Sequence, residues 1–134
     1  MSDIGSLKSV KIKLISFGFK YGYIKSDTVF DVRFIKNPYF IERMRNSSGL
    51  DEETYQFVIS QNETKIFIND IMNLIKDIVP FYKAKGVDRV KIAIGCTGGR
   101  HRSVAVVKYM GQKLRDMGVE VEIEHRDINR GIYE

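Results

Sequence analysis

Hydrophobic residues in this chain recur at two different spacings, and the order of the two spacings constrains the fold more than any other feature. Segments with an apolar residue every three or four positions, the spacing of amphipathic helices, cover residues 67–82 and 104–117. Shorter segments typical of β-strands cover residues 10–14, 28–34, 90–94 and 119–123. Strands separated by long helices favour an α/β fold, with a small, mainly parallel sheet of about four strands flanked by helices.

Capping and turn residues predict where the helices begin and end. Asn37 followed by Pro38 predicts the start of a short helix that continues to about Arg45. Asp51 is expected to cap the next helix, and Pro80 is expected to kink or end the long helix near its last turn.

Size and composition are those of one globular domain over residues 1–134, of which 43% are hydrophobic. No apolar run approaches the roughly 18 residues of a membrane span. Lysines interrupt the only early hydrophobic stretch, so we expect neither a signal peptide nor a membrane partner. Because Cys96 is the only cysteine, no internal disulfide can form, and a cytoplasmic location is expected.

The scarcity of metal-binding side chains predicts that the chain holds no metal and no cofactor. His101 and His125 are its only histidines, which leaves no Cys/His zinc cage. The net charge is +5, from 22 basic and 17 acidic side chains, and the surplus lies in the first third. A basic surface of this kind could attract phosphorylated partners, including RNA, but from charge alone a solvated basic face is the favoured interpretation.

Chemistry is concentrated in a glycine-rich loop, residues 95–103, between a predicted buried strand and a predicted helix. Open α/β sheets usually bind ligands at such a position, and adjacent glycines let backbone N–H groups turn toward an anion. The loop predicts a phosphate site, while the alternative is a tight turn with exposed arginines. The candidate phosphate-binding residues combine glycines, hydroxyls and basic side chains: Thr97, Gly98, Gly99, Arg100, His101, Arg102 and Ser103.

The same loop also satisfies the pattern Cys-x5-Arg-Ser of cysteine-dependent phosphatases. Cys96 would be the nucleophile, Arg102 the phosphate clamp, and Asp31 or Asp127 the general acid. The histidine that usually precedes the phosphatase cysteine is replaced by Gly95. Phosphatase chemistry is therefore the alternative hypothesis for the function. A third interpretation is that Cys96 has no chemical role and is only a small buried residue at the end of a strand.

Several blocks of sequence identify a family. The blocks, in order, are Ser-Phe-Gly-Phe-Lys-Tyr-Gly at 16–22, Val-Phe-Asp-Val-Arg-Phe at 29–34, Asn-Pro-Tyr at 37–39, Gly-Leu-Asp at 49–51, the stretch 93–104 around the loop, and His-Arg-Asp at 125–127. With these blocks the chain resembles the C-terminal domain of the RNase adapter protein RapZ, over about residues 14–127.

The resemblance implies a fold like a phosphofructokinase subdomain and a domain that forms homo-oligomers. It also implies that the domain senses glucosamine-6-phosphate and binds small regulatory RNA. Full-length members of the family carry an N-terminal P-loop kinase-like domain, which we expect to be absent here. A small RNA, a ribonuclease or a separate P-loop protein is therefore the expected kind of macromolecular partner.

Carried over by position, the family's sugar-phosphate pocket assigns a role to two further residues. Asp31 and Tyr39 would face the sugar, while Thr97, the loop glycines, His101 and Arg102 would hold the phosphate. An Asp31 carboxylate would accept hydrogen bonds from an ammonium or from hydroxyls. The alternative is that Asp31 forms an internal pair with Arg33 or Lys20.

The resemblance is weakest at the C-terminal tail. The family binds RNA through a basic tail, but residues 128–134 contain one arginine and one glutamate. Another basic surface could be formed by Lys11, Lys13, Lys20, Lys25 and Lys36. We therefore expect a non-enzymatic module that binds a phosphorylated amino sugar and reports it to a partner, with RNA binding and phosphatase activity as rivals.

Overall fold

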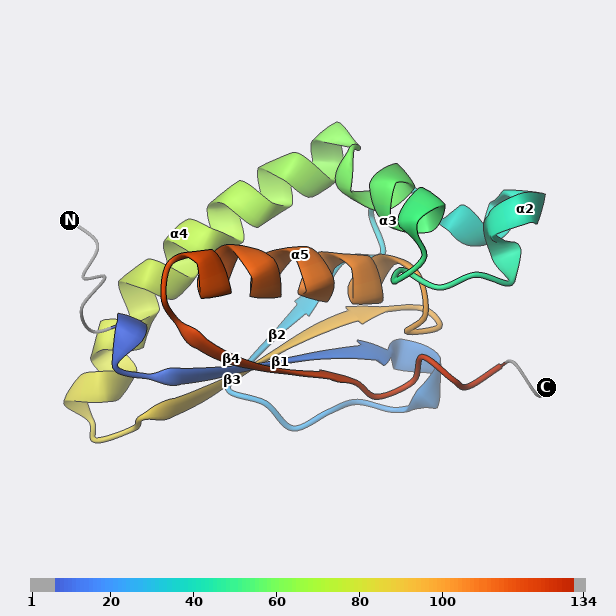
Figure 1. Cartoon of the computed structure of the whole chain (residues 1–134). Coiled ribbons are helices and arrows are strands. Elements are labelled where there is room, and N and C mark those ends of the chain that lie inside the picture. Colours follow the sequence, from blue (N-terminus) through green and yellow to red (C-terminus); the bar gives the residue numbers. More distant parts are fainter. Residues whose placement is uncertain (1–6, 132–134) are drawn as a thin grey trace.

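The computed structural model describes residues 7–131, which form one sheet and a set of helices (Figure 1). In chain order the elements are β1 (Lys11–Gly18), η1 (Phe19–Tyr21), β2 (Thr28–Asp31), η2 (Pro38–Phe40), α2 (Glu42–Arg45), α3 (Glu52–Ile59), α4 (Asn62–Ala84), β3 (Arg89–Cys96), α5 (Arg102–Asp116) and β4 (Glu120–His125).

The four strands pair in the order β2-β3-β1-β4, and every pairing is parallel. Lys11 at the start of β1 lies opposite Arg89 on one side and Glu120 on the other. The predicted α/β fold with a mainly parallel sheet is confirmed. Because all strands run the same way, their carboxyl ends meet at one edge, and the loops that follow them gather there.

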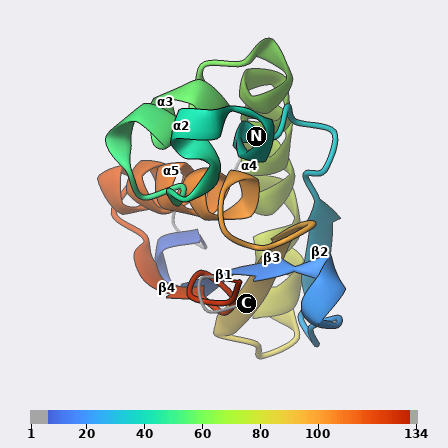
Figure 2. The same ribbon diagram turned by 90° about the vertical axis from the view of Figure 1, so that its right-hand side faces the viewer.

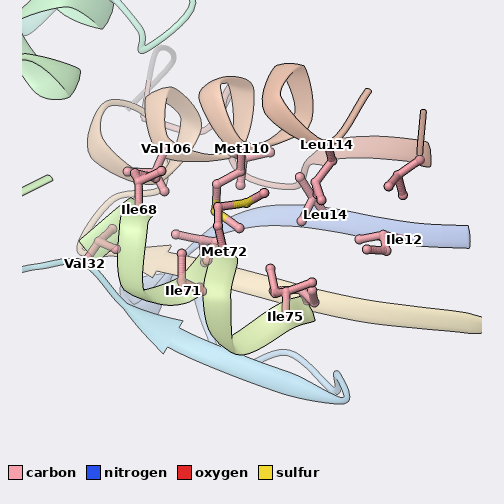
Figure 3. Close-up of a cluster of buried hydrophobic side chains, with 14 of the residues drawn as sticks. Ile12, Leu14, Val32, Ile68, Ile71, Met72, Ile75, Val106, Met110 and Leu114 are labelled. Atoms are coloured by element: carbon pink, nitrogen blue, oxygen red, sulfur yellow. The ribbon is translucent and has the colours of Figure 1, made fainter. Parts of the chain in front are cut away.

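The main core lies between one face of the sheet and the helices α4 and α5. Side chains of both helices converge on Ile12 and Leu14 of β1 (Figure 3). Each such fully buried aliphatic side chain stabilises the fold by about 1.5–3 kcal/mol. The helices contribute Ile68, Ile71, Met72, Ile75 and Val79 from α4, and Ala105, Val106, Val107, Met110 and Leu114 from α5.

The opposite face of the sheet is covered differently. Ile15, Phe17 and Ala93 form a small cluster there, with Phe19 and Ile24 packed against it. Toward the amino ends of the strands this face carries charged residues instead. There the lysines of β1 pair with glutamates of β4, at distances of 3.0–3.7 Å between nitrogen and oxygen.

The second strand is shorter than the sequence predicts. It was expected over residues 28–34 but ends at Asp31, because the Asp31 carboxylate accepts the backbone N–H of Arg33 at 2.9 Å. This local turn replaces further strand pairing. Phe34, expected on a buried face with Val32, is therefore 53% exposed, while Val32 is fully buried.

The predicted helix 37–45 is divided into η2 and α2, which meet at Ile41. Asn37 caps the first piece as expected, since its side chain accepts the N–H of Tyr39 at 3.1 Å. Asp51 occupies the capping position of α3, but its carboxylate accepts the N–H of Ser48 instead. Pro80 does not end α4, which continues to Ala84.

Two kinds of feature are absent from residues 7–131. None of their helices has the length and hydropathy needed to span a membrane. Nor do three or more of their His, Cys, Asp or Glu side chains gather closely enough to hold a metal ion.

Candidate functional site

The glycine-rich loop joins β3 to α5 at the carboxyl edge of the sheet, with α2 on one side and the C-terminal turn on the other (Figure 2). Gly99 has a φ of +72°, and a Cβ there would lie 2.4 Å from the backbone nitrogen of Gly18. A Cβ on Gly18 would likewise lie 2.5 Å from the carbonyl carbon of Gly98. Only glycines allow the loop to approach the end of β1 this closely.

A cavity of about 790 Å³ opens beside the loop. It brings together Cys96, Thr97, Gly98, Arg100, His101 and Arg102 from the predicted set, and Tyr39 from η2. Asp31, Gly99, Ser103 and Asp127 are not among the residues that line it. The other lining residues are Lys20, Tyr21, Arg33, Ile35, Asn37, Phe40, Arg45, Asn46, Arg130 and Gly131.

The lining is strongly basic. Six lysine and arginine side chains line the cavity, and no aspartate or glutamate does. Arg33 and Arg130 each form an ion pair with a carboxylate just outside the lining. Within residues 7–131, the remaining basic side chains have no salt bridge: Lys20, Arg45, Arg100 and Arg102. Such a surface attracts anions.

Arg102 is the most deeply placed of these cations, with 5% of the residue exposed. One terminal nitrogen, Nη1, donates to the carbonyl oxygens of Arg33 at 2.7 Å and Ile35 at 3.0 Å. Its Nε is buried and has no hydrogen-bond partner. Burial lowers the pKa of Arg102 from its ordinary value, yet a guanidinium stays charged in proteins. Arg102 therefore combines a desolvated charge with a donor that no protein group satisfies.

The two preceding residues also bond to the segment 33–46. Arg100 donates from Nη2 to the carbonyl oxygen of Asn46 at 2.5 Å, and its Nε, like that of Arg102, is buried without a partner. The Nε2 of His101 lies 3.2 Å from the carbonyl oxygen of Arg45. Three consecutive loop side chains therefore hold the segment that carries Tyr39.

His101 differs from the cationic donor that the sequence suggested. Burial, reinforced by the charge of Arg100, lowers the pKa of His101 below its ordinary value of 6.5. The imidazole is therefore neutral at pH 7. Its Nε2 carries the hydrogen, because that nitrogen faces a carbonyl oxygen.

Cys96, which lines the cavity, and Ser103, which does not, form a buried pair. The Cys96 Sγ lies 3.1 Å from the Ser103 hydroxyl oxygen, and it accepts the N–H groups of Gly99 at 3.3 Å and Ser103 at 3.5 Å. The thiol residue is 2% exposed, and Ser103 is fully buried. The Ser103 hydroxyl thus contacts the thiol rather than the cavity.

Asp31 forms the internal pair with Arg33 that was the alternative to a ligand contact. Its carboxylate accepts from Arg33 Nε at 2.9 Å and from Nη2 at 2.6 Å. These hydrogen bonds lower the pKa of Asp31, so the carboxylate is ionised at neutral pH. The Arg33 guanidinium lines the cavity and stacks over the ring of Phe19 at 4.3 Å.

Asp127 is fully buried and organises the C-terminal turn. It accepts the backbone N–H of Gly18 at 2.7 Å, and it lies 2.8 Å from a terminal nitrogen of Arg126 and 2.9 Å from Nε of Arg130. Its Oδ2 takes the hydrogen bonds, whereas Oδ1 forms an ion pair with Arg130 but accepts no hydrogen bond. The carboxylate does not line the cavity. It acts as an anchor that brings Arg130 to the cavity wall.

Sequence reasoning did not assign Tyr21, Arg45, Asn46 or Arg130 to the site. Arg45 and Asn46 lie at the end of a short helix, and Arg130 lies beyond the last strand, so no local motif marks them. Tyr21 does lie in one of the blocks that identified the family. The early lysines do not form one surface, because Lys11 and Lys13 pair with glutamates while Lys20 lines the cavity.

Comparisons with known proteins identify the family of the chain. A family model described as "RapZ C-terminal domain" matches residues 10–129. The chain is 48% identical over 120 residues to a nucleotide-binding protein of Listeria innocua, covering 89% of this chain and 41% of that protein. It is 47% identical over 124 residues to a nucleotide-binding protein of Staphylococcus haemolyticus, covering 91% and 41%. It thus spans about two fifths of the length of these relatives.

Proposed function

Since the chain belongs to the RapZ C-terminal domain family, we propose that its pocket binds a phosphorylated amino sugar of the glucosamine-6-phosphate type and reports it to a partner. The observation that carries the proposal is the buried Arg102, whose unpartnered Nε lies beside a glycine-rich loop. An N–H group buried without a partner costs about 1–3 kcal/mol, and a bound phosphate oxygen would remove that cost.

The phosphate end of the ligand belongs at the loop. Backbone N–H groups near Gly98, the Thr97 hydroxyl and the Nε atoms of Arg100 and Arg102 supply donors from one short segment. Helix α5 begins at Arg102, so its positive end also faces the loop. Planar guanidinium groups match the geometry of phosphate oxygens. Neutral His101 would add a donor without a charge.

The sugar end belongs toward Tyr39 and Asp31. Tyr39 lines the cavity and is 49% exposed, so its ring and hydroxyl are accessible to a sugar. Asp31 is ionised and would select the ammonium of an amino sugar, provided that the Arg33 guanidinium gives up the carboxylate. The ligand's ammonium would then replace the Arg33 guanidinium, and the Asp31 carboxylate would keep a positively charged partner.

Reporting to a partner would use the segment 33–46. The loop residues that would bind the phosphate also bond to backbone carbonyls of that segment, which exposes Phe40 at its surface. A small RNA, a ribonuclease, a separate P-loop protein or another copy of the chain would be the partner. The matched charges of Lys11 and Lys13 leave RNA a smaller basic surface than the sequence suggested.

Isothermal titration calorimetry with glucosamine-6-phosphate, glucose-6-phosphate and inorganic phosphate tests the proposal. We expect the amino sugar to bind most tightly to the wild type. Asp31→Asn should remove the preference over glucose-6-phosphate, because a neutral amide attracts an ammonium less than a carboxylate does. Asp116→Asn, on the exposed side of α5, is the matched control. Equal binding of all three compounds would reduce the site to a general anion loop.

The geometry of Cys96 supports a second candidate, a cysteine-dependent phosphatase. Its Sγ accepts two backbone N–H groups and contacts a hydroxyl at the start of α5, the position that the pattern Cys-x5-Arg-Ser gives to the nucleophile. However, the general acid has no clear source, since Asp31 is ionised and paired and Asp127 is buried away from the cavity. Turnover of an aryl phosphate that is lost in Cys96→Ser would favour this candidate. No turnover by the wild type, or full turnover by Cys96→Ser, would eliminate it.

A further inference from the structure

We propose that the cavity contains a second anion subsite, formed by Lys20, Tyr21 and Arg130, and that it takes a small molecule with two phosphate groups. This inference rests on the proposed function, because the first phosphate is the one bound at the glycine-rich loop. The second phosphate would bind at the other wall of the cavity, beside η1 and the C-terminal turn.

The charge of the cavity exceeds what one phosphate needs. A phosphate monoester carries about −1.5 to −2 charges at neutral pH, which the two loop arginines already balance. Arg33 is balanced by Asp31. Of the other cations on the walls, Lys20 and Arg45 have no salt bridge to a described carboxylate, and Arg130 shares the carboxylate of Asp127 with Arg126. Arg45 donates to the carbonyl oxygen of Tyr39, whereas Lys20 and Arg130 lie together at η1 and the C-terminal turn, where a second anion could contact both.

The two remaining cations are held on one aromatic ring. The guanidinium carbon of Arg130 lies 5.0 Å from the centre of the Tyr21 ring, and the Nζ of Lys20 lies 5.0 Å from the same centre. Arg130 is fixed a second time by the buried carboxylate of Asp127. Donors that are already positioned lose less conformational entropy when they bind a ligand.

The second subsite (Lys20, Tyr21 and Arg130) keeps a net positive charge although Arg130 is paired with Asp127. Asp127 lies within ion-pair distance of both Arg126 and Arg130, so one negative charge is shared between two guanidinium groups. Lys20 adds a further charge and has no salt bridge in the described part of the chain. A second phosphate would offset this surplus.

The position of the cluster sets the size of the ligand. The backbone N–H of Lys20 bonds to the carbonyl oxygen of Thr97 at 3.1 Å, so the second subsite begins directly beside the loop. Figure 2 shows the C-terminal turn on the side of the loop that faces away from α2. Both subsites open into one cavity of about 790 Å³, which falls within the range of about 300–1,000 Å³ for small-molecule pockets. A sugar bisphosphate is the chemical class that spans them.

Glucose-6-phosphate and glucose-1,6-bisphosphate form a matched pair of probes, because they differ by one phosphate group. We expect calorimetry to show that the wild type binds the bisphosphate at least about tenfold more tightly, the gain of one charge-assisted hydrogen bond. Arg130→Gln should reduce this ratio to near one. Arg89→Gln, which removes a paired arginine from the distant sheet face, should leave the ratio as in the wild type.

The outcomes separate this inference from the proposed function. If the wild type binds both sugars equally, or if Arg130→Gln keeps the full ratio, the second subsite is wrong while the loop site stands. If glucosamine-6-phosphate binds but neither glucose phosphate does, the second subsite is wrong while the proposed function stands. If none of the three sugars binds, the proposed function fails and the second subsite fails with it. Should Arg130→Gln unfold, Lys20→Gln provides the same test on the other cation, since Lys20 is exposed and makes no ion pair to a described carboxylate.

Discussion

Two groups of basic side chains in this molecule have opposite kinds of partner. On the open face of the sheet, Lys11, Lys13 and Arg89 pair with a row of glutamates on β4, with Glu122 at the centre. At the carboxyl edge, the arginines of the glycine-rich loop bond to backbone carbonyls and line a cavity without an acidic side chain.

The difference shows why total charge says little about function. A lysine beside a glutamate is balanced and exposed to water, so it offers a ligand little. An arginine whose partners are neutral carbonyls keeps its full charge, and at Arg102 it is also shielded from water. The position of the carboxylates, rather than the number of cations, distinguishes the candidate site.

The largest expected effect concerns the buried carboxylate of Asp127, which contacts the end of β1 and pairs with Arg130 at the cavity. Asp127→Ala should lower the free energy of unfolding by about 2–4 kcal/mol, because it leaves the Gly18 N–H and the partly buried Arg126 without their acceptor, while the more exposed Arg130 loses only an ion pair. Urea denaturation would measure the change. Asp116→Ala, an exposed carboxylate on α5, is the control. A loss below about 1 kcal/mol would mean that water replaces Asp127 at little cost.

The next effect separates the two groups of cations directly. Arg102→Met should weaken glucosamine-6-phosphate binding by at least about a hundredfold, since it removes a desolvated charge and its hydrogen bonds. Lys13→Met removes a cation of similar length from the sheet face and should leave the affinity unchanged. Circular dichroism of both variants would verify folding. Equal losses in the two variants would show that overall charge, rather than the site, attracts the ligand.

A smaller effect should appear as a dependence of stability on pH. Burial lowers the pKa values of His101 and His125 below their ordinary 6.5, so the unfolded chain takes up protons there more readily than the folded one. Stability should therefore be complete above pH 6.5 and should fall as the pH drops toward the folded-state pKa values. Urea denaturation at several pH values would measure this.

His125→Asn is the variant that tests the assignment. Its side chain lies 2.7 Å from the buried Ser16 hydroxyl, and its removal should reduce the slope of stability against pH. If the slope is unchanged in this variant, and also in His101→Asn, other groups are responsible for it.

The smallest effect belongs to the sheet face. Glu122→Gln should lower the melting temperature only slightly, because Glu122 is exposed and its ion pairs are screened by water. Calorimetric melting in low salt and in about 1 M salt would compare variant and wild type, and the difference should vanish at high salt. A large difference that persists at high salt would mean that these ion pairs behave like buried ones.

The fold was predictable because hydrophobic spacing reports burial. The strand 119–123, with glutamates at alternate positions, became β4 with one exposed face, and the segment 104–117 became most of α5. The errors arose where a side chain competes with the backbone for a hydrogen bond. The Asp31 carboxylate ends β2 early, and that competition depends on the position of Arg33 as well as on the local sequence.

The site was predictable only as far as it is local. Loop residues 96–102 could be recognised together because they are contiguous, and Tyr39 came from the family resemblance. Arg45 and Arg130 come from elements that the fold brings to the same edge, and no spacing in the sequence indicates that. The neutral state of His101 could not be predicted either, because it follows from burial.

The order of the strands also has a consequence for how the chain is made. β1 is an inner strand of the sheet, between β3 and β4, although it comes first of the four in the sequence. The contact between Ser16 and His125 joins residues 109 positions apart. β1 can therefore pair with both of its neighbours, β3 and β4, only after nearly the whole domain has left the ribosome. Folding of this domain is expected to be late, cooperative and dependent on protection of the exposed β1 segment during synthesis.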